Sequence, residues 1–150
     1  MDNVKFVQSL YSAFSRGDME TIYEGCDPNI DWWSNVDPAL VPWGGGRRGI
    51  DGVKSFFAEI AAHVDFETFE PQQFLNGQGF VLVLGHTIAR MKPAGGRIDD
   101  EWAHCLWIRG GKVVQFREFS DTHAVIQAYH GADAHAVAAS AATTQPRLHH

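Results

Sequence analysis

The sequence predicts an α+β fold in which helices pack against one face of a mostly antiparallel sheet. Apolar residues recur with helical spacing in the first part of the chain, and β-rich runs follow one another in the second part. Glycine-rich turns join the later runs, as they do in hairpins. A chain of 150 residues fits one domain. Because no glycine-rich phosphate loop follows a strand, a nucleotide-binding fold is not expected.

The N-terminal part of the chain is expected to form two helices, with a third after a long loop. Apolar side chains over 4–14 lie at three- and four-residue steps, which places them on one helix face. Asp18 can cap a short second helix over 19–25. The loop over 35–49 holds two prolines and four glycines, and helical spacing returns over 50–63. These helices present apolar faces that need a sheet to cover them.

Five strands are expected after a turn over 27–29, and short connections join the last three. Residues 92–96 contain a proline and two glycines, and positions 110–111 are both glycine, so these strands pair antiparallel. Asp121 can cap a last helix that extends to Tyr129. The strands are expected over 30–34, 64–74, 80–91, 97–108 and 113–119.

The composition changes near residue 131, where the last predicted helix stops. We expect residues 1–131 to form a single domain. Residues 132–150 are rich in alanine and threonine and contain no aromatic side chain. A helix without large apolar residues docks poorly, so this tail is expected to be weakly ordered or helical.

Charge and cysteine usage exclude several classes of function. Twelve Lys and Arg against eighteen Asp and Glu give a net charge of −6, without a basic cluster for nucleic acid or for anionic membrane surfaces. No run approaches the about 20 apolar residues of a membrane span, and the start of the chain does not look like a signal peptide. Cytoplasm is therefore the expected location. Cys26 and Cys105 are expected to be buried free thiols, and the histidines are not spaced to bind a metal. Neither a metal nor another cofactor is expected.

The last hairpin brings an imidazole close to a carboxylate. If the turn over 109–111 contains a glycine bulge, His104 lies opposite Glu118; with a plain two-residue turn it lies opposite Arg117. Gly111 favours the bulge. A carboxylate in an apolar pocket tends to have a raised pKa, and a histidine beside it can shuttle protons at neutral pH. The same pair could also only contact a ligand, or only stabilise the fold.

Four segments, in this order, resemble the nuclear transport factor 2-like superfamily, and within it the SnoaL-like, ketosteroid isomerase-related proteins. They are FSRGD at 14–18, DPNIDW at 27–32, PWGG at 42–45 with RGIDGV at 48–53, and WAH at 102–104 with FREFSD at 116–121. The resemblance implies a cystatin-like α+β roll. In this fold about three N-terminal helices and a cone-shaped, strongly curved, mixed or antiparallel sheet enclose an apolar cavity. It also implies a homodimer built on the outer sheet face.

Two active sites of this superfamily are not supported by the residues present. Trp32 stands where ketosteroid isomerases carry their general base, and a tryptophan cannot take a proton from carbon. Gly85 and Thr87 stand where epoxide hydrolases carry an arginine and an aspartate. The remaining candidates, His104 and Glu118, match the positions used by polyketide cyclase-like members.

The resulting hypothesis is an enzyme that performs acid–base chemistry on a small apolar carbonyl compound, of isomerase, cyclase or dehydratase type. Glu118 would act as base or acid, and His104 would polarise or relay. Asp121 joins the catalytic candidates as a residue near the pocket rim, although it can also be a simple helix cap. The expected cavity-lining residues are Phe14, Trp32, Phe57, Trp102 and Phe116. Two alternatives stay open: a non-catalytic module that binds an apolar ligand, and a dimeric scaffold whose cavity is filled by its own side chains.

Overall fold

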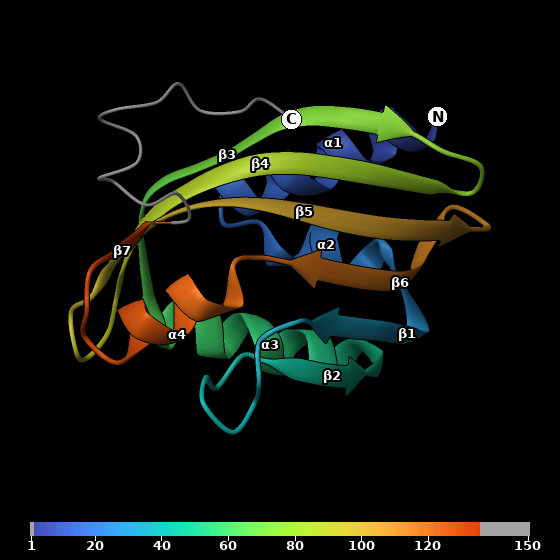
Figure 1. The fold of residues 1–150 in the computed structure, drawn as a ribbon. Helices are drawn as coiled ribbons and strands as arrows, with labels where there is room; N and C mark the ends of the chain where they lie inside the picture. Colours follow the sequence, from blue (N-terminus) through green and yellow to red (C-terminus); the bar gives the residue numbers. More distant parts are fainter. Residues whose placement is uncertain (1, 136–150) are drawn as a thin grey trace.

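The computed structural model describes residues 2–135, which fold as four helices against a curved seven-stranded sheet (Figure 1). The helices are α1 (Asn3–Ser15), α2 (Met19–Glu24), α3 (Gly49–His63) and α4 (Thr122–Tyr129). The strands are β1 (Cys26–Ser34), β2 (Gly45–Arg48), β3 (Val64–Asn76), β4 (Phe80–Met91), β5 (Arg97–Arg109), β6 (Lys112–Phe119) and β7 (Ala134–His135). The predicted α+β class and the helix positions are confirmed. None of the described helices is long and apolar enough to cross a membrane.

The sheet is mixed, with strand order β2-β1-β6-β5-β4-β3. Strands β3, β4, β5 and β6 form consecutive antiparallel pairs, whereas β1 lies parallel to β6. This parallel contact brings the N-terminal strand beside the last hairpin. Figure 1 shows the long strands arching over the helices. Buried side chains of the strands, of α1 and of α3 belong to one hydrophobic cluster. The sheet and helices thus enclose an interior that opens between them.

Several strands differ from the sequence prediction. Strand β1 begins at Cys26, so it includes the predicted turn over 27–29. The expected loop over 35–49 contains β2, which pairs antiparallel with β1. The alternation of apolar and polar side chains could not reveal this strand, because Gly45 and Gly46 have no side chains that alternate. Strand β3 also contains a β-bulge next to Pro71, where its pairing with β4 shifts register between Pro71 and Gln73. A proline is tolerated there because β3 lies at the edge of the sheet.

The domain extends slightly past residue 131. Ala134 and His135 form β7, which pairs in parallel with Ile98 and Asp99 of β5. The first residues of the predicted tail therefore belong to the sheet and are not helical. Residues 136–150 lie outside the described part of the chain, so the prediction for them stays a prediction.

The core fills the space between the helices and the concave side of the sheet. Val7 of α1, Val53 of α3, and Val81 and Val83 of β4 are fully buried, as their spacing predicts. Cys26 and Cys105 are both buried and unpaired, as expected. Burial raises the pKa of Cys26 to about 12, which disfavours its thiolate form near neutral pH.

Candidate functional site

The β5–β6 hairpin places His104 opposite Glu118, which confirms the predicted pairing. The local cause differs from the prediction. Gly110 and Gly111 have positive φ angles of 59° and 76° and form a two-residue turn. Two successive residues in this conformation are typical of a tight hairpin turn that favours glycine. A turn of this kind alone would leave His104 facing Arg117.

A bulge further along β6 restores the predicted register. Ile108 pairs with Val113, but the preceding Trp107 pairs with Gln115, so Val114 is one extra residue on β6. The extra residue shifts the rest of β6 by one position and turns the Glu118 side chain to the inner face. The bulge was expected at the turn; the structure places it between the turn and the site.

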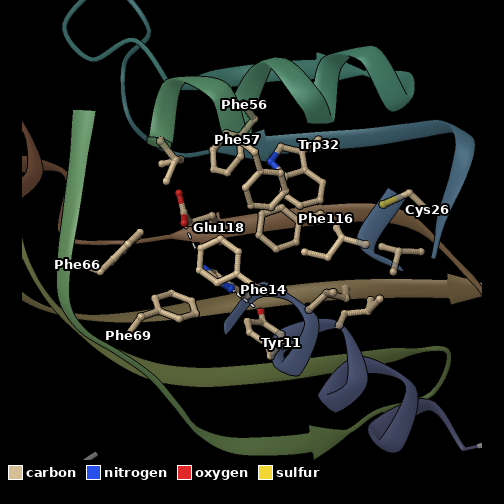
Figure 2. Close-up of a pocket in the computed structure, with 16 residues that line it drawn as sticks. Tyr11, Phe14, Cys26, Trp32, Phe56, Phe57, Phe66, Phe69, Phe116 and Glu118 are labelled. Carbon is tan, nitrogen blue, oxygen red and sulfur yellow. Dashed lines mark hydrogen bonds and ion pairs between the residues drawn. The ribbon is translucent and has the colours of Figure 1, made fainter. Parts of the chain in front are cut away.

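Four side chains from four elements form a hydrogen-bonded chain in the interior. Figure 2 labels two of them, Tyr11 and Glu118. The Tyr11 hydroxyl of α1 lies 2.5 Å from Nδ1 of His104. Nε2 of His104 lies 3.2 Å from Oε2 of Glu118. The Ser34 hydroxyl, at the end of β1, donates to Oε1 of Glu118 at 2.8 Å. His104 and Ser34 are buried, whereas Tyr11 and Glu118 are partly buried and reach the surface of a cavity.

Sequence reasoning missed Tyr11 and Ser34. Tyr11 lies on the apolar face of α1. The sequence pattern there predicts a core residue and gives no sign that the hydroxyl group forms a functional hydrogen bond. Ser34 carried a usable signal, because strand alternation puts it on the same face as Trp32. It could have been paired with Glu118 only by knowing that β1 lies beside β6.

The carboxylate of Glu118 has a lower pKa than usual, opposite to the expectation from the sequence. Burial alone raises its pKa, but the hydrogen bond and charge of His104 and the Ser34 hydroxyl outweigh burial. Burial and the nearby Glu118 charge raise the pKa of the Tyr11 phenol well above its ordinary value. The chain therefore combines an ionised carboxylate with a protonated phenol, on either side of the imidazole.

This chain borders an apolar cavity of about 690 Å³, counting its open mouth. Among the predicted lining residues, Phe14, Trp32, Phe57 and Phe116 contribute to its wall (Figure 2). The rings of Trp32 and Phe116 stack with centroids 3.9 Å apart and form one side of it. The Tyr11, His104 and Glu118 side chains are the main polar groups in this wall.

Trp102, which was expected to line the cavity, is not part of the wall of the first cavity. Its indole packs flat against Gly85 of β4, where an added Cβ would come within 2.2 Å of the ring. Its N–H donates to the Thr87 hydroxyl at 2.8 Å. The indole thus occupies the space beside Gly85 and Thr87 on the inner face of β4. Trp102 stacks on His104 with centroids 4.0 Å apart and lines a second, adjoining cavity.

Asp121 lies apart from the linings of both cavities in the described chain. Its carboxylate accepts from the backbone N–H of Ala124 at 3.1 Å and caps α4. The structure shows the capping role of Asp121, and its catalytic role stays a prediction. Within residues 2–135, no group of three or more His, Cys, Asp or Glu side chains is placed to hold a metal ion.

The sequence profile of the SnoaL-like domain matches residues 7–116. The chain belongs to the SnoaL-like family. The SnoaL-like domain lies within the nuclear transport factor 2-like superfamily, as its fold and its neighbours agree. No curated protein matches this SnoaL-like chain in sequence.

Solved structures resemble this SnoaL-like domain over most of its length. An NTF2-like protein from Burkholderia xenovorans LB400 is 27% identical, with a TM-score of 0.77, over 85% of this chain and 95% of its own. TerC, co-crystallised with polyporic acid, is 23% identical with a TM-score of 0.75, over 85% and 97% of the two chains. A Mesorhizobium loti structure with the provisional name SnoaL-like polyketide cyclase is 10% identical, with a TM-score of 0.67, over 79% and 99%.

Proposed function

We propose that this SnoaL-like domain binds a small, mostly apolar carbonyl compound in its first cavity and moves a proton on it. The observation that carries the proposal is the Tyr11–His104–Glu118–Ser34 chain, set in an otherwise aromatic and aliphatic wall. A ligand in this cavity meets apolar surface on most sides and one acid–base chain. Such a chain supports general acid–base catalysis near neutral pH.

Glu118 is the base in this proposal. Its lowered pKa keeps it ionised, and a carboxylate has about four lone-pair sites, of which Ser34 and His104 occupy two. Glu118 takes a proton from the carbon beside the carbonyl, and the C–H electron pair forms the enolate double bond. Returning that proton to another carbon completes an isomerisation. Delivering it to a departing hydroxyl group completes a dehydration.

His104 and Tyr11 adjust the charge on Glu118 during this cycle. A hydroxyl can donate or accept, so Tyr11 can donate to an unprotonated Nδ1 and accept from a protonated one. The chain therefore keeps its hydrogen bonds in both protonation states of the imidazole. This lets a proton arrive at or leave His104 without a buried group losing its partner.

The relatives support an organic ligand in this fold. TerC was co-crystallised with polyporic acid, and the Mesorhizobium loti neighbour carries a polyketide cyclase name. The first cavity opens to solvent, and this supports the entry of a ligand. The alternative of a non-catalytic binding module requires an experiment.

The test measures proton exchange at carbon, using 2-tetralone as a bicyclic apolar ketone. In D2O buffer, NMR follows loss of the proton signal beside the carbonyl, with and without protein. We expect the wild type to accelerate exchange and Glu118→Gln to lower that acceleration about 100-fold or more. Glu101→Gln is the matched control, because Glu101 lies on the exposed side of β5. It should exchange the probe at the wild-type rate.

The outcomes separate the two functions. Exchange that depends on Glu118 supports the enzyme. Binding of 2-tetralone, seen by chemical-shift changes in the cavity residues, without any accelerated exchange would favour the binding module. Exchange that survives in Glu118→Gln would remove Glu118 from the role of base.

We also propose that two copies associate through the outer face of the sheet. Phe119 is 45% exposed on β6 and packs edge-on against Trp33 of β1, with ring centroids 5.5 Å apart. Trp107 of β5 and Phe80 of β4 form a second aromatic pair, with centroids 6.1 Å apart. Phe119 is exposed and the other three side chains are partly buried, and aromatic side chains at the surface are typical of interfaces.

A further inference from the structure

A second cavity adjoins the first and extends toward α4. The volume of this second cavity is about 530 Å³ when the space at its open mouth is included. The side chains that border both cavities are Ile60, Phe66, Phe69, His104 and Glu118. The acid–base pair thus stands between two adjoining spaces, and a ligand beside it can reach into both.

The second cavity contains a buried carboxyl group that the proposed mechanism does not use. Asp100 lies on the same inner face of β5 as His104 and is 4% exposed. Its Oδ1 is buried and has no hydrogen-bond partner. Buried polar atoms are almost always paired, because an unpaired one loses its bonds to water without replacement. An unpaired oxygen in a cavity wall therefore indicates a place for a ligand group.

The surroundings of Asp100 favour an uncharged ligand. Neither cavity has a Lys or Arg side chain in its described lining, whereas Asp100 and Glu118 both contribute carboxyl groups. A carboxylate or phosphate there would meet like charges without a cation to balance them. Burial raises the pKa of Asp100 to about 7, and it outweighs hydrogen bonds from the backbone of Asp121 and Glu101 that lower this pKa. The charges of Asp121 and Glu118 raise the pKa further. Asp100 can therefore hold a proton and donate it to a ligand oxygen.

We propose that Asp100 binds a hydroxyl or carbonyl oxygen at one end of an uncharged ligand whose apolar body lies in the first cavity. The Ser120 and Thr87 side chains add polar surface beside it. The inference deepens the proposed function and rests on it in one respect: a ligand must enter the first cavity. It names the substrate class as neutral, elongated, and oxygenated at the end away from the Trp32–Phe116 stack.

Three matched probes test this proposal: biphenyl, 4-hydroxybiphenyl and biphenyl-4-carboxylate. Their affinities are measured by calorimetry with the full chain at pH 6. We expect 4-hydroxybiphenyl to bind about five- to tenfold more tightly than biphenyl, the range that one hydrogen bond supplies. We expect biphenyl-4-carboxylate to bind most weakly of the three.

Two variants assign the preference to Asp100. Asp100→Leu should bring the ratio of the first two affinities to about one, because leucine fills similar space without a polar atom. Asp99→Asn changes the neighbouring carboxylate, whose side chain pairs with His86 at 2.6 Å on the other face of β5. It should keep the wild-type ratio. An unchanged ratio in Asp100→Leu, or tightest binding of the carboxylate, would overturn the proposal.

A measurement on the wild type covers the case in which Asp100→Leu does not fold. The carboxyl carbon of Asp100, observed by NMR, should shift when 4-hydroxybiphenyl is added and should not shift with biphenyl. The same shift with both probes, or with neither, would contradict the proposal. If biphenyl itself fails to bind, the proposed function fails. Binding of biphenyl without a hydroxyl preference removes only the role of Asp100.

Discussion

The imidazole of His104 and the carboxylate of Glu118 face one another across the β5–β6 pair, 3.2 Å apart, and both side chains border two cavities at once. The contact depends on a single extra residue, Val114, because the hairpin turn alone would pair His104 with Arg117. The position of this bulge therefore decides whether His104 faces a carboxylate or a guanidinium group in the interior.

The phenol of Tyr11 should contribute to turnover through His104. Tyr11→Phe removes the hydrogen bond to Nδ1 and keeps the ring that packs against Trp102 and Phe74. We expect the 2-tetralone exchange rate to fall about fivefold and the free energy of unfolding to fall by about 1 kcal/mol.

Tyr23→Phe is the control for this change. The Tyr23 ring lies under the Lys54 ammonium group, and Tyr23 is absent from the linings of both cavities in the described chain. The control should exchange 2-tetralone at the wild-type rate. Equal rates for Tyr11→Phe and the wild type would show that the phenol only packs.

The cap of α4 gives a prediction that separates stability from activity. Asp121→Ala removes the acceptor for the Ala124 N–H and should lower the free energy of unfolding by about 1 kcal/mol, measured by urea denaturation. Asp121→Ser, which can still cap the helix, should recover most of that loss. Neither variant should change proton exchange on 2-tetralone. If the rate of proton exchange falls with Asp121→Ala and stays low with Asp121→Ser, Asp121 takes part in catalysis.

The sequence was informative wherever a periodic pattern carried the structure. Helical spacing located α1 and α3, and strand alternation put His104 and Glu118 on inner faces. The sequence was uninformative where the structure depends on contacts between residues that are far apart in the chain. Ser34 reaches Glu118 only because β1 lies parallel to β6, a pairing that no local pattern specifies.

The pKa of Glu118 shows the same limit in energetic terms. From the sequence, an apolar pocket was expected to raise the pKa of this carboxyl group. The structure lowers it, because two hydrogen-bond donors from other elements outweigh burial. Asp100 shows the opposite outcome on the same inner face: with its Oδ1 unpaired, burial prevails and the pKa rises to about 7. Burial can be predicted from alternation, whereas the partners of a buried group cannot.

The outer sheet face should hold two copies together through Phe119. Phe119→Asp places a charge in the exposed aromatic group and should shift a dimer to monomer, measured by light scattering during size-exclusion chromatography. Leu40→Asp is the control, because Leu40 is 43% exposed but lies in the segment between β1 and β2. It should leave the mass unchanged. A wild type that elutes as a monomer would contradict the proposed interface.

The buried carboxyl group of Asp100 should make the protein less stable as the pH rises. Its folded pKa is about 7, above the ordinary value of 3.8, so between these values the folded protein holds a proton that the unfolded chain has released. Folding takes up this proton, and the contribution of Asp100 to the free energy of unfolding therefore falls with rising pH. Asp100→Asn cannot ionise. It should exceed the wild type in stability at pH 8 by on the order of a few kcal/mol.

Urea denaturation between pH 4.5 and 8.5 checks this expectation, since the advantage of Asp100→Asn should shrink steadily as the pH falls toward 4.5. Asp99→Asn serves as the control, because Asp99 is partly exposed and pairs with His86 on the other face of β5. It should show no such gain at pH 8. The pH range also separates the effect of Asp100 on stability from that of Glu118. The pKa of Glu118 is lowered by folding, so its contribution to the free energy of unfolding is lost only as the pH falls below 4.5. A difference between Asp100→Asn and the wild type that does not change with pH would mean that Asp100 is ionised throughout this range. The carboxyl group would then act as a hydrogen-bond acceptor, and its ligand would have to bring the proton.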